Sequence, residues 1–132
     1  MTATEETLAL ARSAALAASD LQGTEIVGLD VSDQLYVTEV FVVASASNER
    51  QVNAIVGEVE EKLFLEHEVK PVRREGRGGG RWVLLDFGDL VVHVFHQEDR
   101  EFYQLESLWK DCPVVDLKLP AEPGEAAGTG EV

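Results

Sequence analysis

Three histidines are the first residues in this chain that could carry chemistry. His93 and His96 are three positions apart, and with His67 they could be considered as ligands of one metal ion. Residues three apart on a strand point to opposite faces, so His93 and His96 cannot both reach one ion while the strand continues. We therefore expect no metal site. The simpler interpretation is a half-buried His93 that is bonded to a neighbour and an exposed His96.

Two serines stand at a predicted strand-to-helix corner, which is where nucleotidyl transferases place a glycine-serine pair. Those enzymes also need more than one carboxylate near the corner to hold magnesium ions. Directly after Ser45 and Ser47, the only carboxylate near this corner is that of Glu49. No serine lies in a Gly-x-Ser-x-Gly motif, and the single cysteine, Cys112, cannot form a two-cysteine redox or metal motif. We therefore expect no active site and no cofactor, and we predict that the protein is not an enzyme.

The charge of the chain is strongly negative and unevenly distributed. Eleven basic and 25 acidic residues give a net charge of −14, which opposes general binding to nucleic acid or anionic membrane and favours a basic partner. Five of the basic residues fall within residues 70–81, against one acidic residue, Glu75. The glycines of this stretch precede a strand, whereas phosphate-binding loops follow a strand and open a helix. The stretch is better interpreted as a flexible basic loop that could touch RNA phosphates.

Length and composition indicate one domain. A chain of 132 residues with 45% hydrophobic residues can build one core, and no window reaches the roughly 18 apolar residues of a membrane span. The acidic N-terminus lacks the positive start of a secretory signal, so we expect a cytoplasmic protein. We place the domain at residues 1–112. Residues 121–132 contain three glutamates and no basic residue, so we predict that 113–132 is an acidic, disordered tail.

The hydrophobic pattern predicts the element order α β β α β β β α. Asn48 is expected to cap the second helix, with Gln51 bonding back to the cap. Hairpins at both ends and a crossover helix between them predict an α/β (α+β) fold, a mixed five-stranded sheet flanked by helices. The predicted helices cover residues 4–19, 48–63 and 99–109, and the predicted strands cover residues 25–30, 36–44, 70–74 and two segments of 82–95.

The last two strands form a hairpin that is apolar on both faces. Trp82 and Leu84 point to one face of their strand, and the residues that alternate with them point to the other. A central strand that is buried on both sides would explain this pattern. Alternatively, one face is only partly covered, and Trp82 is left exposed for a partner, since tryptophan is a common interface hot spot. Asp86 and Asp89 favour the second interpretation, because carboxylates beside an apolar patch suit a lysine- or arginine-bearing partner.

Several of these segments together resemble the ribosomal silencing factor family, also called Iojap. The resemblance is carried by WVLLDFGDLVVHVF at residues 82–95 and REFYQLESLW at residues 100–109, with support from residues 29–32 and 44–52. It covers about residues 4–112. It implies a fold like that of a nucleotidyltransferase without the catalytic carboxylates. It also implies a module that docks on ribosomal protein L-fourteen of the large ribosomal subunit, blocks joining of the small subunit when nutrients are scarce, and is often a homodimer when free.

We therefore predict that the hairpin is the partner-binding surface. Its contact residues would be Trp82, Leu84, Asp86, Phe87 and Asp89, with the two carboxylates facing lysines or arginines of the partner. Two alternatives remain at this stage: a nucleotidyltransferase-like enzyme, and an RNA-binding module that uses residues 70–81. Neither the glycine-rich loop nor the tail receives a role from the resemblance.

Overall fold

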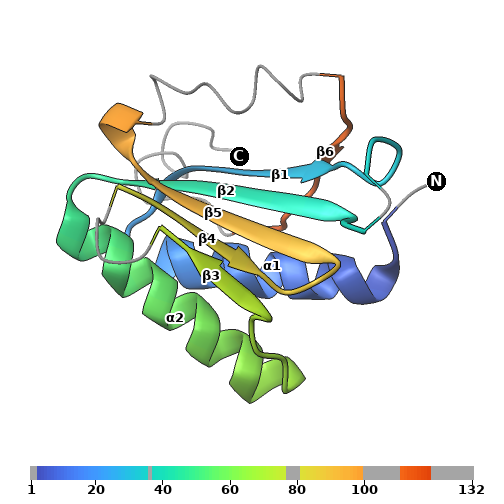
Figure 1. Ribbon diagram of the computed structural model, residues 1–132, viewed down its shortest axis with the longest axis horizontal. Coiled ribbons are helices and arrows are strands. Elements are labelled where there is room, and N and C mark those ends of the chain that lie inside the picture. Colours follow the sequence, from blue (N-terminus) through green and yellow to red (C-terminus); the bar gives the residue numbers. More distant parts are fainter. Residues whose placement is uncertain (1–2, 36, 77–80, 100–110, 120–132) are drawn as a thin grey trace, which may run out of the picture.

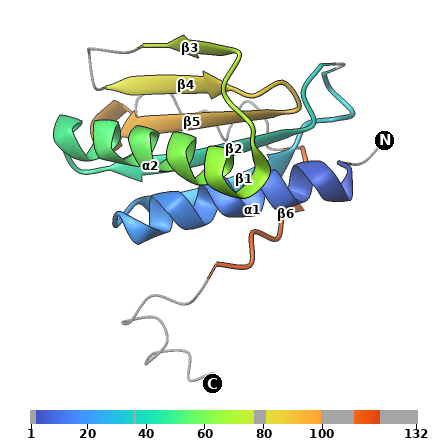
Figure 2. The same cartoon turned by 90° about the horizontal axis from the view of Figure 1, so that it is seen from below.

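In the described part of the chain, two helices cover one face of a mixed sheet (Figure 1, Figure 2). The computed structural model describes residues 3–35, 37–76, 81–99 and 111–119. Within these residues the sheet has six strands in the order β3-β4-β5-β2-β1-β6. The elements are α1 (Glu5–Asp20), β1 (Thr24–Asp30), β2 (Val40–Ala46), α2 (Glu49–His67), β3 (Arg73–Glu75), β4 (Trp82–Asp86), β5 (Leu90–His96) and β6 (Val114–Val115).

The predicted mixed sheet flanked by helices is confirmed, with one strand more than expected. The predicted order of elements is also confirmed from α1 to β5. The second strand begins at Val40, later than predicted, and the two ends of the connection before it are joined by a 2.8 Å hydrogen bond from the Val31 N–H to the Glu39 carbonyl. The predicted last helix lies outside the described residues from residue 100 onward. No helix among the described residues is long and apolar enough to cross a membrane.

Asn48 caps the start of α2 as predicted, but the Gln51 side chain bonds back to Ser47, one residue before the cap. The Asn48 side chain accepts a 2.8 Å hydrogen bond from the Gln51 N–H, and the Gln51 side chain accepts one of 2.7 Å from the Ser47 N–H. The Gln51 amide also donates to the carbonyls of Leu21 and Gln22, at 2.9 and 3.0 Å. Gln51 therefore joins the start of α2 to the residues that follow α1.

The two faces of the sheet differ in what covers them. On the first face, β2, β4 and β5 pack against α1 and α2, which both lie on that side (Figure 2). The strands β2 and β5 pair in parallel at the centre, and all seven residues of each are buried. We call the face that α1 and α2 do not cover the second face. Its buried apolar and ring-bearing side chains from the two central strands are Phe41, Val43, Val91, His93 and Phe95.

The folded domain continues to residue 119, although the sequence placed its end at Cys112. Val114 and Val115 pair with β1, and Leu117 is only 7% exposed in the core. Gly28 permits this close packing, because a Cβ at this position would lie 2.9 Å from a methyl group of Leu117. The disordered tail stays a prediction for residues 120–132, which lie outside the described residues.

A chain that ends at Cys112 should therefore be less stable than one that ends at Leu119. It loses the β1–β6 pairing and the buried Leu117 side chain, so we expect its free energy of unfolding to fall by about 2 kcal/mol or more. The chain that ends at Leu119 should stay within about 0.5 kcal/mol of the full length. Urea unfolding followed by circular dichroism measures both, and equal stability of the two truncated chains would contradict a structural role for residues 113–119.

Candidate interaction surface

The β4–β5 hairpin places part of the predicted surface on the second face of the sheet. Along β4, Val83 and Leu85 are fully buried toward the helices, while Trp82, Leu84 and Asp86 are half-buried on the other side. The predicted alternation of this strand is thus confirmed. Leu84 packs against an apolar cluster of the second face that includes Phe41, Val91 and Cys112.

Phe87 does not lie with these residues. It is only 8% exposed and packs in the core between the sheet and the helices. The sequence contained a signal for this, because Phe87 continues the alternation of Val83 and Leu85. Of the five predicted contact residues, Phe87 is therefore the one that the structure places in the core.

Trp82 is held by an aromatic cluster. Its ring stacks on Phe95, with centroids 4.7 Å apart and planes inclined by 27°. Its Nε1–H donates a 3.3 Å hydrogen bond to Nδ1 of His93. The His93 ring in turn meets Phe41 edge-on, with centroids 4.8 Å apart. Phe41 and Phe95 were not predicted from the sequence, because only the pairing of β4, β5 and β2 brings Phe95 next to Trp82 and Phe41 next to His93.

His93 is a neutral, buried side chain. It is 4% exposed, and burial lowers its pKa from 6.5 to about 4. Since Nδ1 accepts from Trp82, the proton of the neutral ring is on Nε2, which has no hydrogen-bond partner among the described residues. The expected bond to a neighbour is present, but the side chain is fully buried rather than half-buried.

His96 differs from its prediction, because it is buried rather than exposed. It is 9% exposed and its Nδ1 accepts a 3.2 Å hydrogen bond from the Glu98 N–H. His93 and His96 point to opposite faces of β5, as expected from their spacing. Within the described part of the chain, no group of three or more histidine, cysteine or acidic side chains could hold a metal ion.

The turn between β4 and β5 uses its two aspartates differently. Asp86 accepts a 2.8 Å hydrogen bond from the Gly88 N–H and lies 3.4 Å from the Arg73 guanidinium. Gly88 has a φ of +96°, which a residue with a side chain rarely adopts. The carbonyl of Asp89 accepts from the Glu39 and Val40 N–H groups, and its side chain is exposed. Asp86 thus shapes the turn, while the carboxylate of Asp89 is available to a partner.

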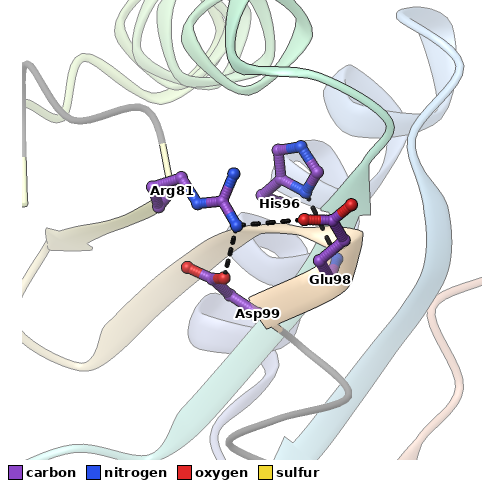
Figure 3. A network of polar contacts seen from close by, with 4 residues as sticks. All are labelled: Arg81, His96, Glu98 and Asp99. Atoms are coloured by element: carbon purple, nitrogen blue, oxygen red, sulfur yellow. Dashed lines mark hydrogen bonds and ion pairs between the residues drawn. The ribbon is translucent and has the colours of Figure 1, made fainter.

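The other end of the hairpin is joined by a polar network (Figure 3). Arg81, just before β4, lies 2.9 Å from Asp99 and 3.2 Å from Glu98, which both follow β5. These hydrogen bonds raise the pKa of the Arg81 guanidinium. The His96 N–H also donates a 2.7 Å bond to the Arg81 carbonyl. The network therefore fixes the end of the hairpin that lies nearest to Trp82.

The arginines of the basic stretch are partly neutralised within the fold. Arg74 makes two hydrogen bonds to Glu60, at 2.6 and 2.9 Å. Arg73 lies 3.2 Å from Glu75 in addition to its contact with Asp86. With Arg81, these pairs show that the described arginines of residues 70–81 each face a carboxylate of the same chain.

The strand-to-helix corner has the residues of a helix cap. Ser45 is fully buried, and the Ser47 hydroxyl donates a 2.8 Å hydrogen bond to the side chain of Gln51. Glu49 is exposed on the first turn of α2. These side chains order the start of a helix, and their arrangement does not indicate phosphate chemistry.

Comparison with known proteins points to one family. The model of the family described as ribosomal silencing factor during starvation matches residues 4–130. The chain is 38% identical over 104 residues to the ribosomal silencing factor of Bacillus subtilis, which covers 79% of this chain and 87% of that protein. A crystal structure of a Chromobacterium violaceum protein superposes with a TM-score of 0.74 at 34% identity, covering 82% of this chain and 88% of that one.

A further relative is the mouse protein named mitochondrial assembly of ribosomal large subunit protein 1. It is 33% identical over 87 residues, which are 64% of this chain and 38% of that protein.

The buried His93 should make the stability of the fold depend on pH. Its pKa is about 4 in the folded state and 6.5 in the unfolded state, so the unfolded chain takes up a proton first as pH falls. The stability that the neutral His93 side chain contributes to the fold is fully present above pH 6.5 and is lost as the pH falls from about 6.5 to 4. Relative to pH 7, the wild type should lose about 2 to 3 kcal/mol at pH 4.5 that His93→Phe does not lose. Urea unfolding at both pH values measures this, and a parallel pH dependence of the two proteins would show that His93 titrates normally.

Proposed function

The chain belongs to the ribosomal silencing factor family, and we propose that it binds the large ribosomal subunit through ribosomal protein L-fourteen and sterically blocks association with the small subunit. The family consists of regulatory proteins rather than enzymes. The name of the mouse relative, which refers to assembly of the large ribosomal subunit, supports a partner on that subunit. In this proposal the protein acts in the cytoplasm, silences ribosomes under nutrient limitation, and is a homodimer when free.

One observation carries the docking surface. Half-buried Trp82 and Leu84 lie on the second face of the sheet, and the exposed carboxylate of Asp89 stands at the turn of the same hairpin. A large aromatic side chain beside an apolar cluster, with an acidic group at the far end of the same hairpin, matches the usual anatomy of a protein interface, in which polar groups border an apolar centre. Asp86 contributes by shaping the turn, and Phe87 supports the hairpin from the core.

The charge of the chain supports a basic protein as the partner. A net charge of −14 attracts the domain to a basic ribosomal protein and repels it from the surrounding RNA phosphates, which favours one landing place. The alternative of an RNA-binding module is less well supported, because Arg73, Arg74 and Arg81 face carboxylates of the chain itself. A protein bound to a ribosomal protein on the large subunit could also make peripheral contact with the neighbouring ribosomal RNA.

Inhibition in this proposal requires no chemistry. A domain that occupies the intersubunit side of the large subunit makes its own binding and that of the small subunit mutually exclusive, so inhibition follows occupancy. The protein should therefore co-sediment with free large subunits and be absent from joined ribosomes. Co-sedimentation also distinguishes the proposed function from that of a nucleotidyltransferase-like enzyme. Such an enzyme would transfer label from a nucleotide, and its binding would not prevent the subunits from joining.

Trp82→Ala should weaken binding to the large ribosomal subunit. Loss of an interface hot spot costs about 2 kcal/mol or more, which is roughly a 30-fold loss of affinity. We expect Trp82→Ala to bind isolated large subunits correspondingly more weakly in sedimentation assays, and to need a higher concentration to prevent purified subunits from joining. Leu65→Ala is the matched control, because Leu65 is apolar, 69% exposed and carried by α2 on the first face. If folded Trp82→Ala bound as tightly as the control, Trp82 would not be in the interface.

Asp89→Lys should slow association and weaken its dependence on salt. The exposed carboxylate faces a basic partner surface in this proposal, and rim charges act mainly on the association rate. Glu61→Lys on α2 makes the same change of net charge away from the hairpin, and so controls for long-range effects. Association rates with large subunits at several salt concentrations would decide, and identical salt slopes for both variants would argue against a basic surface opposite Asp89.

A further inference from the structure

We infer that His93 is a positioning residue that holds the Trp82 indole in its docking orientation and occupies the indole N–H, so that the partner surface opposite Trp82 is apolar. This inference rests on the proposed function, because it concerns the anchor of the same surface. It starts from the hydrogen bond of 3.3 Å between Trp82 Nε1 and His93 Nδ1.

Two contacts restrain the indole in different ways. The stacking on Phe95 sets the plane of the ring, but a stacked ring can still slide or turn within that plane. The hydrogen bond to His93 removes this freedom, because it fixes the direction of the Nε1–H bond. In the register of β4 and β5, Trp82 is opposite Phe95, and Leu84 is opposite His93. The Trp82 and His93 rings are therefore diagonal neighbours within reach of each other.

The acceptor is itself rigidly placed. His93 lies on a central strand between β4 and β2, is 4% exposed, and packs edge-on against Phe41. It has little room to rotate, so its Nδ1 presents a fixed lone pair to Trp82. An anchor that is ordered before docking loses less side-chain entropy when the partner binds.

A histidine at this position destabilises the fold relative to an apolar ring, and its Nδ1 acceptor for Trp82 is the feature that would explain its presence. Its Nε2–H is buried and has no partner among the described residues, which costs free energy that phenylalanine would avoid. Phenylalanine would fill a similar volume and could keep the edge contact with Phe41. The one feature that it could not supply is the acceptor for Trp82.

The same bond constrains the partner. Because the Trp82 N–H is used within the protein, a partner gains nothing by placing an acceptor over it and gains by covering the carbon surface of the indole. The surface opposite Trp82 should therefore be aliphatic, with the basic groups of the partner displaced toward Asp89.

Two substitutions separate positioning from packing. His93→Phe keeps an apolar ring and removes the acceptor, and His93→Asn keeps an acceptor near the place of Nδ1. We expect His93→Phe to be at least as stable as the wild type at pH 7 and to bind isolated large subunits about three- to tenfold more weakly, as for the loss of one hydrogen bond. His93→Asn should recover most of this affinity. The indole N–H resonance, assigned by its loss in Trp82→Phe, should exchange faster and broaden in His93→Phe alone.

The outcomes distinguish this inference from the proposed function. Wild-type affinity of His93→Phe together with weak binding of Trp82→Ala would overturn the positioning role and leave the docking surface in place. Wild-type affinity of Trp82→Ala would overturn both. Equal losses in His93→Phe and His93→Asn would show that the imidazole matters for packing alone.

The nitrogen spectrum of the wild type gives a test that needs no substitution, should His93→Phe fail to fold. At pH 7 the inference requires a His93 ring with an unprotonated Nδ1 and a protonated Nε2, and the opposite tautomer would overturn it.

Discussion

The parallel pairing of β2 and β5 is the constraint on which the rest of the structure depends. Seven residue pairs, from Val40 with Leu90 to Ala46 with His96, join two strands that are buried along their whole length. A parallel pair needs a crossover connection, and here α2 lies in it and covers the first face. Because both faces of these strands are apolar, the second face must also be shielded from water.

Burial decreases from this central pair toward the edge of the sheet, and this gradient locates the candidate surface. All of β5 is buried, β4 alternates between buried and half-buried residues, and β3 at the edge is fully exposed. Trp82 and Leu84 lie where an apolar face passes into solvent. Such a boundary suits an interface anchor, because the side chain is held by the core on one side and can meet a partner on the other.

The polar groups around the hairpin divide into those that build it and those that a partner could use. Arg81 with Asp99 and Glu98 fixes one end, and Asp86 with Gly88 shapes the other. Buried His93 orders the indole of Trp82. The exposed carboxylate of Asp89 remains for a partner, at the end of the hairpin opposite the apolar anchor Trp82.

The sequence by itself determined the local features: the alternation along β4, the Asn48 cap, the opposite orientation of His93 and His96, and the motifs of the family. These follow from residues that are close in the chain. Only the tertiary structure decided the burial of His96, the sixth strand, and the bond between Trp82 and His93. Each depends on the register between strands or on segments that are distant in sequence. Periodicity shows which way a side chain points on its own strand, but not which side chain lies beside it on the next.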